Sequence, residues 1–219
     1  MCIRYDLRKA GKQIVNHLVN MFPLVYDFHV SDRLFNLIPE LKELSIGHTR
    51  RNKRRAHGRN TNRDDETSKL AQRIRTKGGQ ELLIYSKSAN FGEDLYSDWM
   101  DKELGTALFV ETWRNGAGTP LNSSCPKDNY KVNNVQDLSV TNGAIKVTWS
   151  YHQDHSKWAI SETKDSGFVC ISDINRMQSQ FKRGGGAVCM RCPSCWSVFS
   201  NTILDLEPCP VAKLHLTQN

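Results

Sequence analysis

The sequence predicts an α/β fold in a single chain of 219 residues. In some segments apolar residues recur at helical spacing, whereas in others they form short runs or alternate as in strands. The two kinds of segment follow one another, which is typical of a largely buried sheet covered by helices. An apolar share of 38 % and a charged share of 24 % are those of a globular chain, so disordered and fibrous classes are excluded.

Helices are expected over residues 7–21 and 32–44, where apolar residues repeat every three or four positions. Pro39 lies inside the second of these segments and is expected to shorten or kink that helix. A third helix is expected near 94–104, and Gly105 is a suitable C-terminal cap for it.

Strands are expected where apolar or alternating runs are bounded by turn residues. The predicted strands are residues 81–86, 106–113, 144–149, 155–160 and 167–171. The segment 114–120 is rich in glycine and is predicted to be a turn.

The net charge of +7 is concentrated in one segment. Residues 48–65 are polar and without period, and positions 50–63 hold seven basic residues and no acidic residue. Basic and acidic residues balance in the rest of the chain, which argues against a broadly basic DNA-coating surface. The segment is interpreted as a solvated loop, with a contact to DNA phosphates and a nuclear-import signal as the alternatives.

The cysteine content favours an oxidising compartment. The chain has seven cysteines, five of them between positions 125 and 195, and a glycosylation sequon at Asn122-Ser123-Ser124. The first residues lack the apolar segment of a signal peptide, so we expect a chain that is truncated at its N-terminus. No run of 18 apolar residues occurs, and no membrane span is expected.

The spacing Cys189-x-x-Cys192-x-x-Cys195 has two interpretations. The thiols could bind zinc or an iron–sulfur cluster, which would make the chain a metal-dependent nucleic-acid binder. A disulfide between Cys192 and Cys195 is at least as well supported, because no second well-spaced pair of ligands accompanies them. We therefore expect neither a metal nor another cofactor.

The triplet His155-Ser156-Lys157 is suited to phosphodiester chemistry. On a strand, residues two positions apart face the same side, so the imidazole and the ammonium would converge. The lysine can neutralise non-bridging oxygens, while the imidazole can attack phosphorus or deliver a proton. A triplet of this kind also recurs by chance, and a strand histidine is more often structural.

Longer motifs in the chain resemble those of type II (acid) deoxyribonucleases, which belong to the phospholipase D superfamily. The motifs are Phe91-Gly92-Glu93-Asp94-Leu95-Tyr96-Ser97-Asp98-Trp99, Leu104-Gly105-Thr106, Gln153-Asp154-His155-Ser156-Lys157-Trp158, Cys170-Ile171-Ser172-Asp173-Ile174-Asn175-Arg176 and Arg183-Gly184-Gly185-Gly186-Ala187-Val188-Cys189. The resemblance corresponds to the C-terminal half of such an enzyme. It implies that residues 1–219 form a phospholipase D-like half with a mixed β-sheet flanked by helices.

The resemblance also implies an endonuclease that cuts DNA at acid pH without a metal ion. Two halves each give one His-x-Lys to a shared site, where one histidine becomes a phosphohistidine and the other protonates the leaving oxygen. His155 is then the catalytic histidine of this half, with Lys157 and Asn175 as phosphate ligands. The candidate substrate-binding residues are Arg183, Gly184, Gly185 and Trp158. Core packing is the alternative for Trp158, because it is the more frequent fate of a strand tryptophan.

Further implications concern the cysteines and the compartment. The resemblance pairs Cys170 with Cys189 and Cys125 with Cys209, and it places the partner of Cys2 in the missing half. Family members are lysosomal or secreted, which agrees with the cysteine content.

The partner motif is absent from this chain, because no other histidine is followed two residues later by lysine. A homodimer or the missing N-terminal half would have to supply it. The alternative is a catalytically inactive DNA-binding or interaction protein derived from the nuclease.

Overall fold

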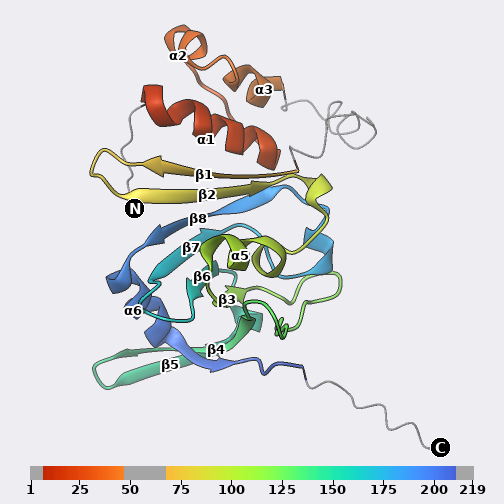
Figure 1. The fold of residues 1–219 in the computed structure, drawn as a ribbon, viewed down its shortest axis with the longest axis vertical. Coiled ribbons are helices and arrows are strands. Elements are labelled where there is room, and N and C mark those ends of the chain that lie inside the picture. Colours follow the sequence, from red (N-terminus) through yellow and green to blue (C-terminus); the bar gives the residue numbers. More distant parts are fainter. Residues whose placement is uncertain (1–6, 47–67, 211–219) are drawn as a thin grey trace, which may run out of the picture.

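The computed structural model describes residues 7–46 and 68–210, in which helices cover both faces of a nine-stranded sheet (Figure 1). The predicted α/β class with a mixed, helix-flanked sheet is confirmed. The predicted basic loop at 48–65 and Cys2 lie outside the described residues. The elements are α1 (Leu7–Met21), α2 (Asp32–Leu37), α3 (Leu41–Ile46), β1 (Lys69–Arg75), β2 (Glu81–Lys87), η2 (Ala89–Phe91), η3 (Tyr96–Met100), α5 (Asp101–Leu104), β3 (Leu108–Thr112), β4 (Val132–Asn142), β5 (Ile145–Ser150), η4 (Tyr151–Gln153), β6 (Lys157–Ser161), β7 (Phe168–Ser172), η5 (Gln178–Gln180), β8 (Gly185–Arg191), α6 (Pro193–Thr202) and β9 (Ile203–Leu206).

The strand order is β1-β2-β8-β7-β6-β3-β4-β5, and β9 pairs with β4. Strands β3 and β4 run parallel, whereas the other pairs are antiparallel. Strand β8, late in the chain, lies between β2 and β7, so the middle of the sheet joins segments that are distant in sequence.

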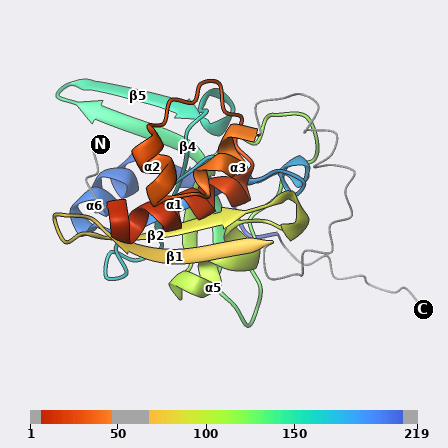
Figure 2. The same ribbon diagram turned by 90° about the horizontal axis from the view of Figure 1, so that it is seen from above.

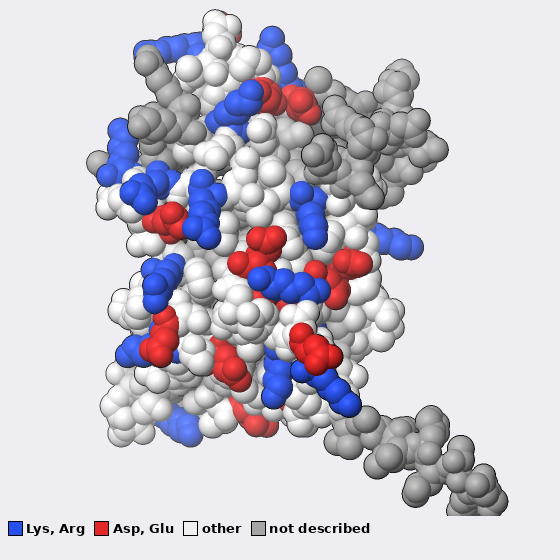
Figure 3. All heavy atoms as spheres, in the orientation of Figure 1, with Lys and Arg blue, Asp and Glu red and all other residues white. Residues whose placement is uncertain are grey.

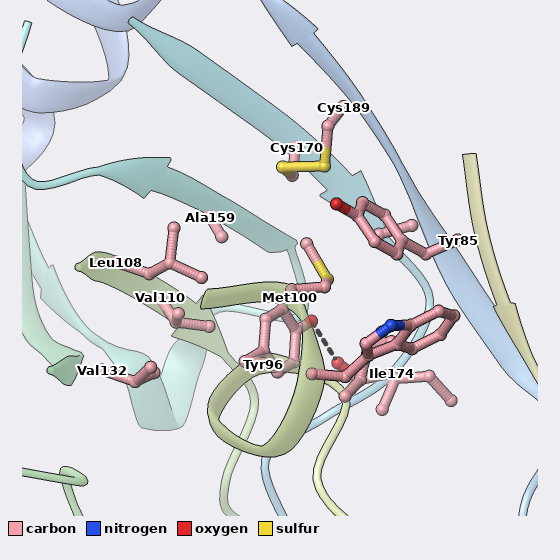
Figure 4. Packing of buried hydrophobic residues seen from close by; sticks show 13 residues of the cluster. Tyr85, Tyr96, Met100, Leu108, Val110, Val132, Ala159, Cys170, Ile174 and Cys189 are labelled. Atoms are coloured by element: carbon pink, nitrogen blue, oxygen red, sulfur yellow. Dashed lines mark hydrogen bonds between the residues drawn. A yellow bond between two sulfur atoms is a disulfide. The ribbon is translucent and has the colours of Figure 1, made fainter. Parts of the chain in front are cut away.

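The two faces of the sheet carry different helices. Helix α1 packs on β1 and β2, and α6 lies on the same face further along the sheet (Figure 2). On the opposite face, η3 and α5 cover a core in which Tyr85 meets Trp99 edge-on and the Tyr96 hydroxyl donates to the Ile174 carbonyl oxygen at 2.7 Å (Figure 4). Both faces are therefore buried along much of the sheet.

The predicted helix at 32–44 is two short helices. Helix α2 ends at Leu37 and α3 begins at Leu41, so the break surrounds Pro39. Proline lacks an N–H group and disfavours helical geometry in the preceding residue, which explains the interruption. The predictions for α1 and for the Gly105 cap agree with the structure, since Gly105 adopts the left-handed conformation that closes α5.

Three disulfides are present among the described residues. Cys170 and Cys189 join neighbouring strands β7 and β8, Cys125 pairs with Cys209, and Cys192 pairs with Cys195 at the start of α6. The pairings implied by the resemblance are thus present, and the sulfurs considered for zinc are bonded to other sulfurs instead of being free thiolates. None of the described helices is long and apolar enough to cross a membrane.

Candidate active site

The candidate residues lie at one end of the sheet because their strands alternate in direction. The C-terminal ends of β2, β3 and β7 meet there with the N-terminal ends of β6 and β8. This arrangement brings together the segment before β6, the turn after β7 and the glycine-rich segment that opens β8.

His155 and Lys157 are close together, but not as two residues of one strand. Strand β6 begins only at Lys157, and His155 lies in the preceding loop, so the predicted strand over 155–160 is wrong at its start. The loop is held by Asp154, which accepts hydrogen bonds from the Ser156 backbone N–H at 2.7 Å and from Trp149 Nε1 at 2.9 Å. These bonds replace strand pairing at this position, and Lys157 Nζ donates back to the His155 carbonyl oxygen at 2.8 Å.

The charge of Asp154 is stabilised by the same contacts. Burial acts to raise the pKa of this carboxyl, but the hydrogen bonds from Trp149 and Ser156 and the nearby Lys157 ammonium outweigh it. The net pKa lies below its ordinary value, so the loop is held by a carboxylate at any pH near neutrality.

The imidazole of His155 stacks on Trp113, the residue directly after β3. The ring centroids are 4.0 Å apart and the ring planes are inclined by 32°. Trp113 is itself held, because its Nε1 donates to the His152 carbonyl oxygen at 3.1 Å. One face of the imidazole is therefore covered by an aromatic ring.

An open depression of about 570 Å³ lies beside this stack. Its wall combines the loop before β6, the first two residues of β6, the end of β7 with the residue that follows it, and one residue of α6. The lining residues are His155, Ser156, Lys157, Trp158, Ile171, Ser172, Asp173 and Phe199. The imidazole and the ammonium thus border the same solvent-accessible volume.

Asn175 does not line this depression, but the residue after it is hydrogen-bonded to β3, the strand that pairs with β6 at Lys157. The backbone N–H of Arg176 donates to Thr112 Oγ1 at 3.1 Å, and Thr112 is the register partner of Lys157. The Asn175 Oδ1 atom is buried and accepts no hydrogen bond from the described residues. Among the described residues, none therefore occupies the amide oxygen of Asn175.

A buried network of ion pairs and hydrogen bonds holds the segments that contain Asn175 and Trp113. Arg176 is 1 % exposed, and it donates through Nε to Asp94 Oδ2 at 3.1 Å and through a terminal nitrogen to Asn134 Oδ1 at 2.6 Å. Asn134 donates to Glu207, which also accepts from Arg114 at 3.1 Å. The network anchors the two segments that carry the candidate phosphate ligand and the stacked tryptophan.

The sequence profile of the family described as Deoxyribonuclease II matches residues 1–209. The chain belongs to the deoxyribonuclease II family. It is similar to plancitoxin-1 of Acanthaster planci (32 % identity over 213 residues, 95 % of this chain and 53 % of that protein). It is also similar to deoxyribonuclease-2-alpha of Mus musculus (31 % identity over 201 residues, 92 % and 51 %) and to cell-death-related nuclease 7 of Caenorhabditis elegans (32 % over 140 residues, 64 % and 37 %). The chain spans about half the length of the first two of these relatives.

The glycine-rich segment that opens β8 has a packing role. A Cβ atom added to Gly184 would lie 2.1 Å from the Met21 carbonyl oxygen, and one added to Gly186 would lie 2.0 Å from that of Tyr85. Gly185 is buried against Asp173 and Ile174, so these glycines permit close approach of α1, β2 and the turn after β7.

A buried lysine fixes the segment that leads to these glycines. Lys87 is fully buried at the end of β2, and its ammonium donates to the carbonyl oxygens of Gln180, Phe181 and Arg183 at 2.9, 3.3 and 2.6 Å. Burial lowers the pKa of Lys87 to about 8. The Arg183 side chain is exposed, and its binding of DNA stays a prediction, as does that of the glycines.

Trp158 is 5 % exposed and packs against Phe199 of α6, with ring centroids 5.0 Å apart. It contributes to the wall of the depression while most of its surface is in the core. Stacking on a base stays a prediction for this residue.

Sequence reasoning missed two residues near the candidate site. Trp113 was placed at the end of a predicted strand without a role, and Glu111 was not singled out. Glu111 is fully buried on β3 opposite Trp158, and neither carboxyl oxygen has a hydrogen-bond partner among the described residues. Burial, with a contribution from Asp154, raises the pKa of Glu111 to about 9. Both residues are far from His155 in sequence, and they come near it because β3 pairs with β6. A sequence pattern does not show this pairing.

The described part of the face that carries α5 has no broad patch of positive charge. In Figure 3, lysines and arginines are interspersed with acidic residues over the described part of the face on which α5 lies. This agrees with the even charge balance outside positions 50–63. Electrostatic attraction of DNA by the described part of this face is therefore expected to be local.

Proposed function

We propose that this chain is the half of an acid endodeoxyribonuclease that supplies one histidine to a shared site, and that it hydrolyses DNA phosphodiester bonds without a metal ion. The observation that supports the proposal is the open depression bordered by both His155 and Lys157. A phosphodiester needs a nucleophile and a positive charge at one place, and these two side chains provide them.

The proposed reaction has two displacement steps. A ring nitrogen of His155 attacks phosphorus, the bond from phosphorus to the leaving deoxyribose oxygen breaks, and a second imidazole gives that oxygen a proton. Water then attacks the phosphohistidine, the phosphorus–nitrogen bond breaks, and the second imidazole accepts the proton of the water. Lys157 and the Asn175 amide bind the non-bridging oxygens in both steps. The pair needs one neutral and one protonated imidazole, which acid pH favours.

The second imidazole has to come from outside the motif in this chain. We propose that it belongs to the other half of the complete enzyme, with a second copy of this chain as the alternative source. Gel filtration of the purified chain measures whether a dimer forms, and a mass showing only monomer excludes the second copy. For the compartment we propose a lysosomal or secreted protein, because three disulfides are stable in an oxidising environment.

The test is plasmid nicking in excess EDTA by the enzyme with its second half-site present, at about pH 5, a pH chosen to protonate part of a histidine pair. His155→Ala is compared with the wild type, and His152→Ala serves as a matched control, since its exposed side chain lies three positions away. Cleavage that survives EDTA, vanishes in His155→Ala and persists in His152→Ala supports the proposal.

Absence of cleavage with DNA still retarded on a gel supports the second candidate function, a catalytically inactive DNA-binding protein. The observation that favours it is that the chain spans about half of its relatives and holds one His-x-Lys motif.

A further inference from the structure

We propose that Trp113 is a positioning residue for His155, and that its indole holds the imidazole in the one orientation the reaction uses. This inference rests on the proposed role of His155 and adds a residue to it. The starting observation is the ring stack, with centroids 4.0 Å apart and planes inclined by 32°.

A reactive histidine is usually oriented by a hydrogen bond to its second ring nitrogen. Neither ring nitrogen of His155 makes such a bond to any residue the structure describes, although the carboxylate of Asp154 is next in sequence. That carboxylate is already used by the Ser156 N–H and by Trp149 Nε1. Stacking on Trp113 is therefore the contact that restricts rotation of the imidazole within the described part of the chain.

The stack leaves the reactive part of the ring accessible. Both nitrogens are on the edge of an imidazole, and Trp113 covers a face. The histidine also lines the open depression, so its edge can meet a phosphate while its face remains against the indole. A hydrogen bond donated to a carboxylate would instead occupy one nitrogen.

Trp113 is rigid enough for this role because three segments hold it. It follows directly after β3, and its Nε1 donates to the His152 carbonyl oxygen at 3.1 Å. A Cβ atom added to Gly116 would lie 3.2 Å from the indole and 3.4 Å from Met177 Sδ, so the chain packs tightly around the ring. An aromatic side chain fixed in this way loses little entropy when it orients a neighbour.

The first experiment measures the geometry and needs no activity. Aromatic ring currents shift the imidazole proton resonances of a stacked histidine, so the His155 signals are recorded by NMR in the wild type, Trp113→Phe and Trp113→Ala. We expect the alanine variant to lose the ring-current shift and the phenylalanine variant to keep most of it. His29, whose side chain is 92 % exposed, is the internal control and keeps its signals in all three proteins.

The second experiment measures catalysis by the enzyme with its second half-site present. We expect Trp113→Ala to lower kcat about 10- to 100-fold with KM within about threefold, because a displaced reacting group loses rate rather than affinity. Trp113→Phe is expected to restore kcat to within about fivefold, since a ring on the same face suffices for positioning. Urea denaturation of each variant separates this effect from loss of fold.

The outcomes distinguish this inference from the proposed function. If His155→Ala abolishes cleavage while Trp113→Ala leaves both kcat and the His155 signals unchanged, the positioning role is wrong and the function stands. If His155→Ala has full activity, the proposed function is wrong, whereas the NMR comparison still decides whether the stack exists. A loss in KM alone would identify Trp113 as a DNA contact and would overturn the positioning role.

Discussion

The buried ion pair between Arg176 and Asp94 gives the most direct test of how the site is supported. The two side chains are 1 % and 3 % exposed, and Nε lies 3.1 Å from Oδ2. Substituting Arg176 by methionine keeps a long apolar stem but removes the charge. Asp94 then keeps only its bonds from the Ser97 N–H and hydroxyl at that oxygen, and Asn134 Oδ1 loses its donor.

The expected cost follows from leaving a carboxylate buried without its cation. Removing one partner of a buried pair costs about 3 to 5 kcal/mol, because the remaining charge is no longer compensated. In a domain of this size each kcal/mol lowers Tm by about 2 to 4 °C, so Arg176→Met should melt about 6 to 20 °C below the wild type. Urea denaturation followed by far-UV circular dichroism gives the free energy of unfolding, and thermal melting gives Tm.

The chain contains a matched control for this substitution. Arg73 pairs with Glu81 at 3.4 Å, but the side chains are 70 % and 49 % exposed. Because exposed pairs contribute about 0 to 1 kcal/mol, Arg73→Met should leave the free energy of unfolding nearly unchanged. Equal losses in the two variants, or a gain in Arg176→Met, would refute the argument that burial of the pair supports the site.

Three further predictions concern stability. Glu111 keeps its proton in the native state up to its raised pKa of about 9, whereas the unfolded chain releases it near the ordinary value of 4.5, so wild-type stability falls as pH rises between these values. Glu111→Gln removes this dependence and should match the wild type near pH 4 but exceed it increasingly towards pH 9, as measured by urea denaturation at each pH. Gly184→Ala should cost about 1 to 3 kcal/mol, because its Cβ would lie 2.1 Å from a backbone oxygen, whereas Gly78→Ala meets only a side-chain oxygen at 3.9 Å and should stay within about 0.5 kcal/mol. Replacing Cys125 and Cys209 together by serine opens a loop with a sequence separation of 84 and should cost about 4 to 5 kcal/mol in reversible unfolding.

Each of these predictions has an outcome that contradicts it. A difference between wild type and Glu111→Gln that stays constant from pH 4 to pH 9 would mean that this carboxyl does not keep its proton. Equal stability of the two glycine variants would mean that α1 moves away from β8 without cost. If the double serine variant unfolds at the wild-type urea midpoint, the Cys125–Cys209 bond does not restrict the unfolded chain.

The parts of the fold that were predictable from sequence have strong local signals. Helix α1 has a clear apolar period, and Gly105 closes α5 in the left-handed conformation that favours glycine. Strand β2 was found from its apolar run. Strands β1, β4, β8 and β9 and helix α6 were not predicted, because their apolar faces are short or partial and become meaningful only beside their partners in the sheet.

The site shows the same division. The motifs around His155 and Lys157 were sufficient to predict family membership, but their local geometry was not predicted. The spacing of His155 and Lys157 suggested that both lie on one strand. In the structure the Asp154 carboxylate accepts the Ser156 N–H in place of a neighbouring strand, so β6 begins only at Lys157.

The sequence alone determined the α/β class, the position of the His-x-Lys motif, the resemblance to acid deoxyribonucleases and, through that resemblance, two disulfide pairings. These depend on residue identity and spacing within short segments. The tertiary structure decided that Trp113 lies against His155, that Arg176 compensates Asp94, and that Glu111 is buried without a partner. These contacts join segments about 40 or more positions apart, or depend on the environment that such segments create. Strand order and register fix them, and neither is encoded in the pattern of any single segment.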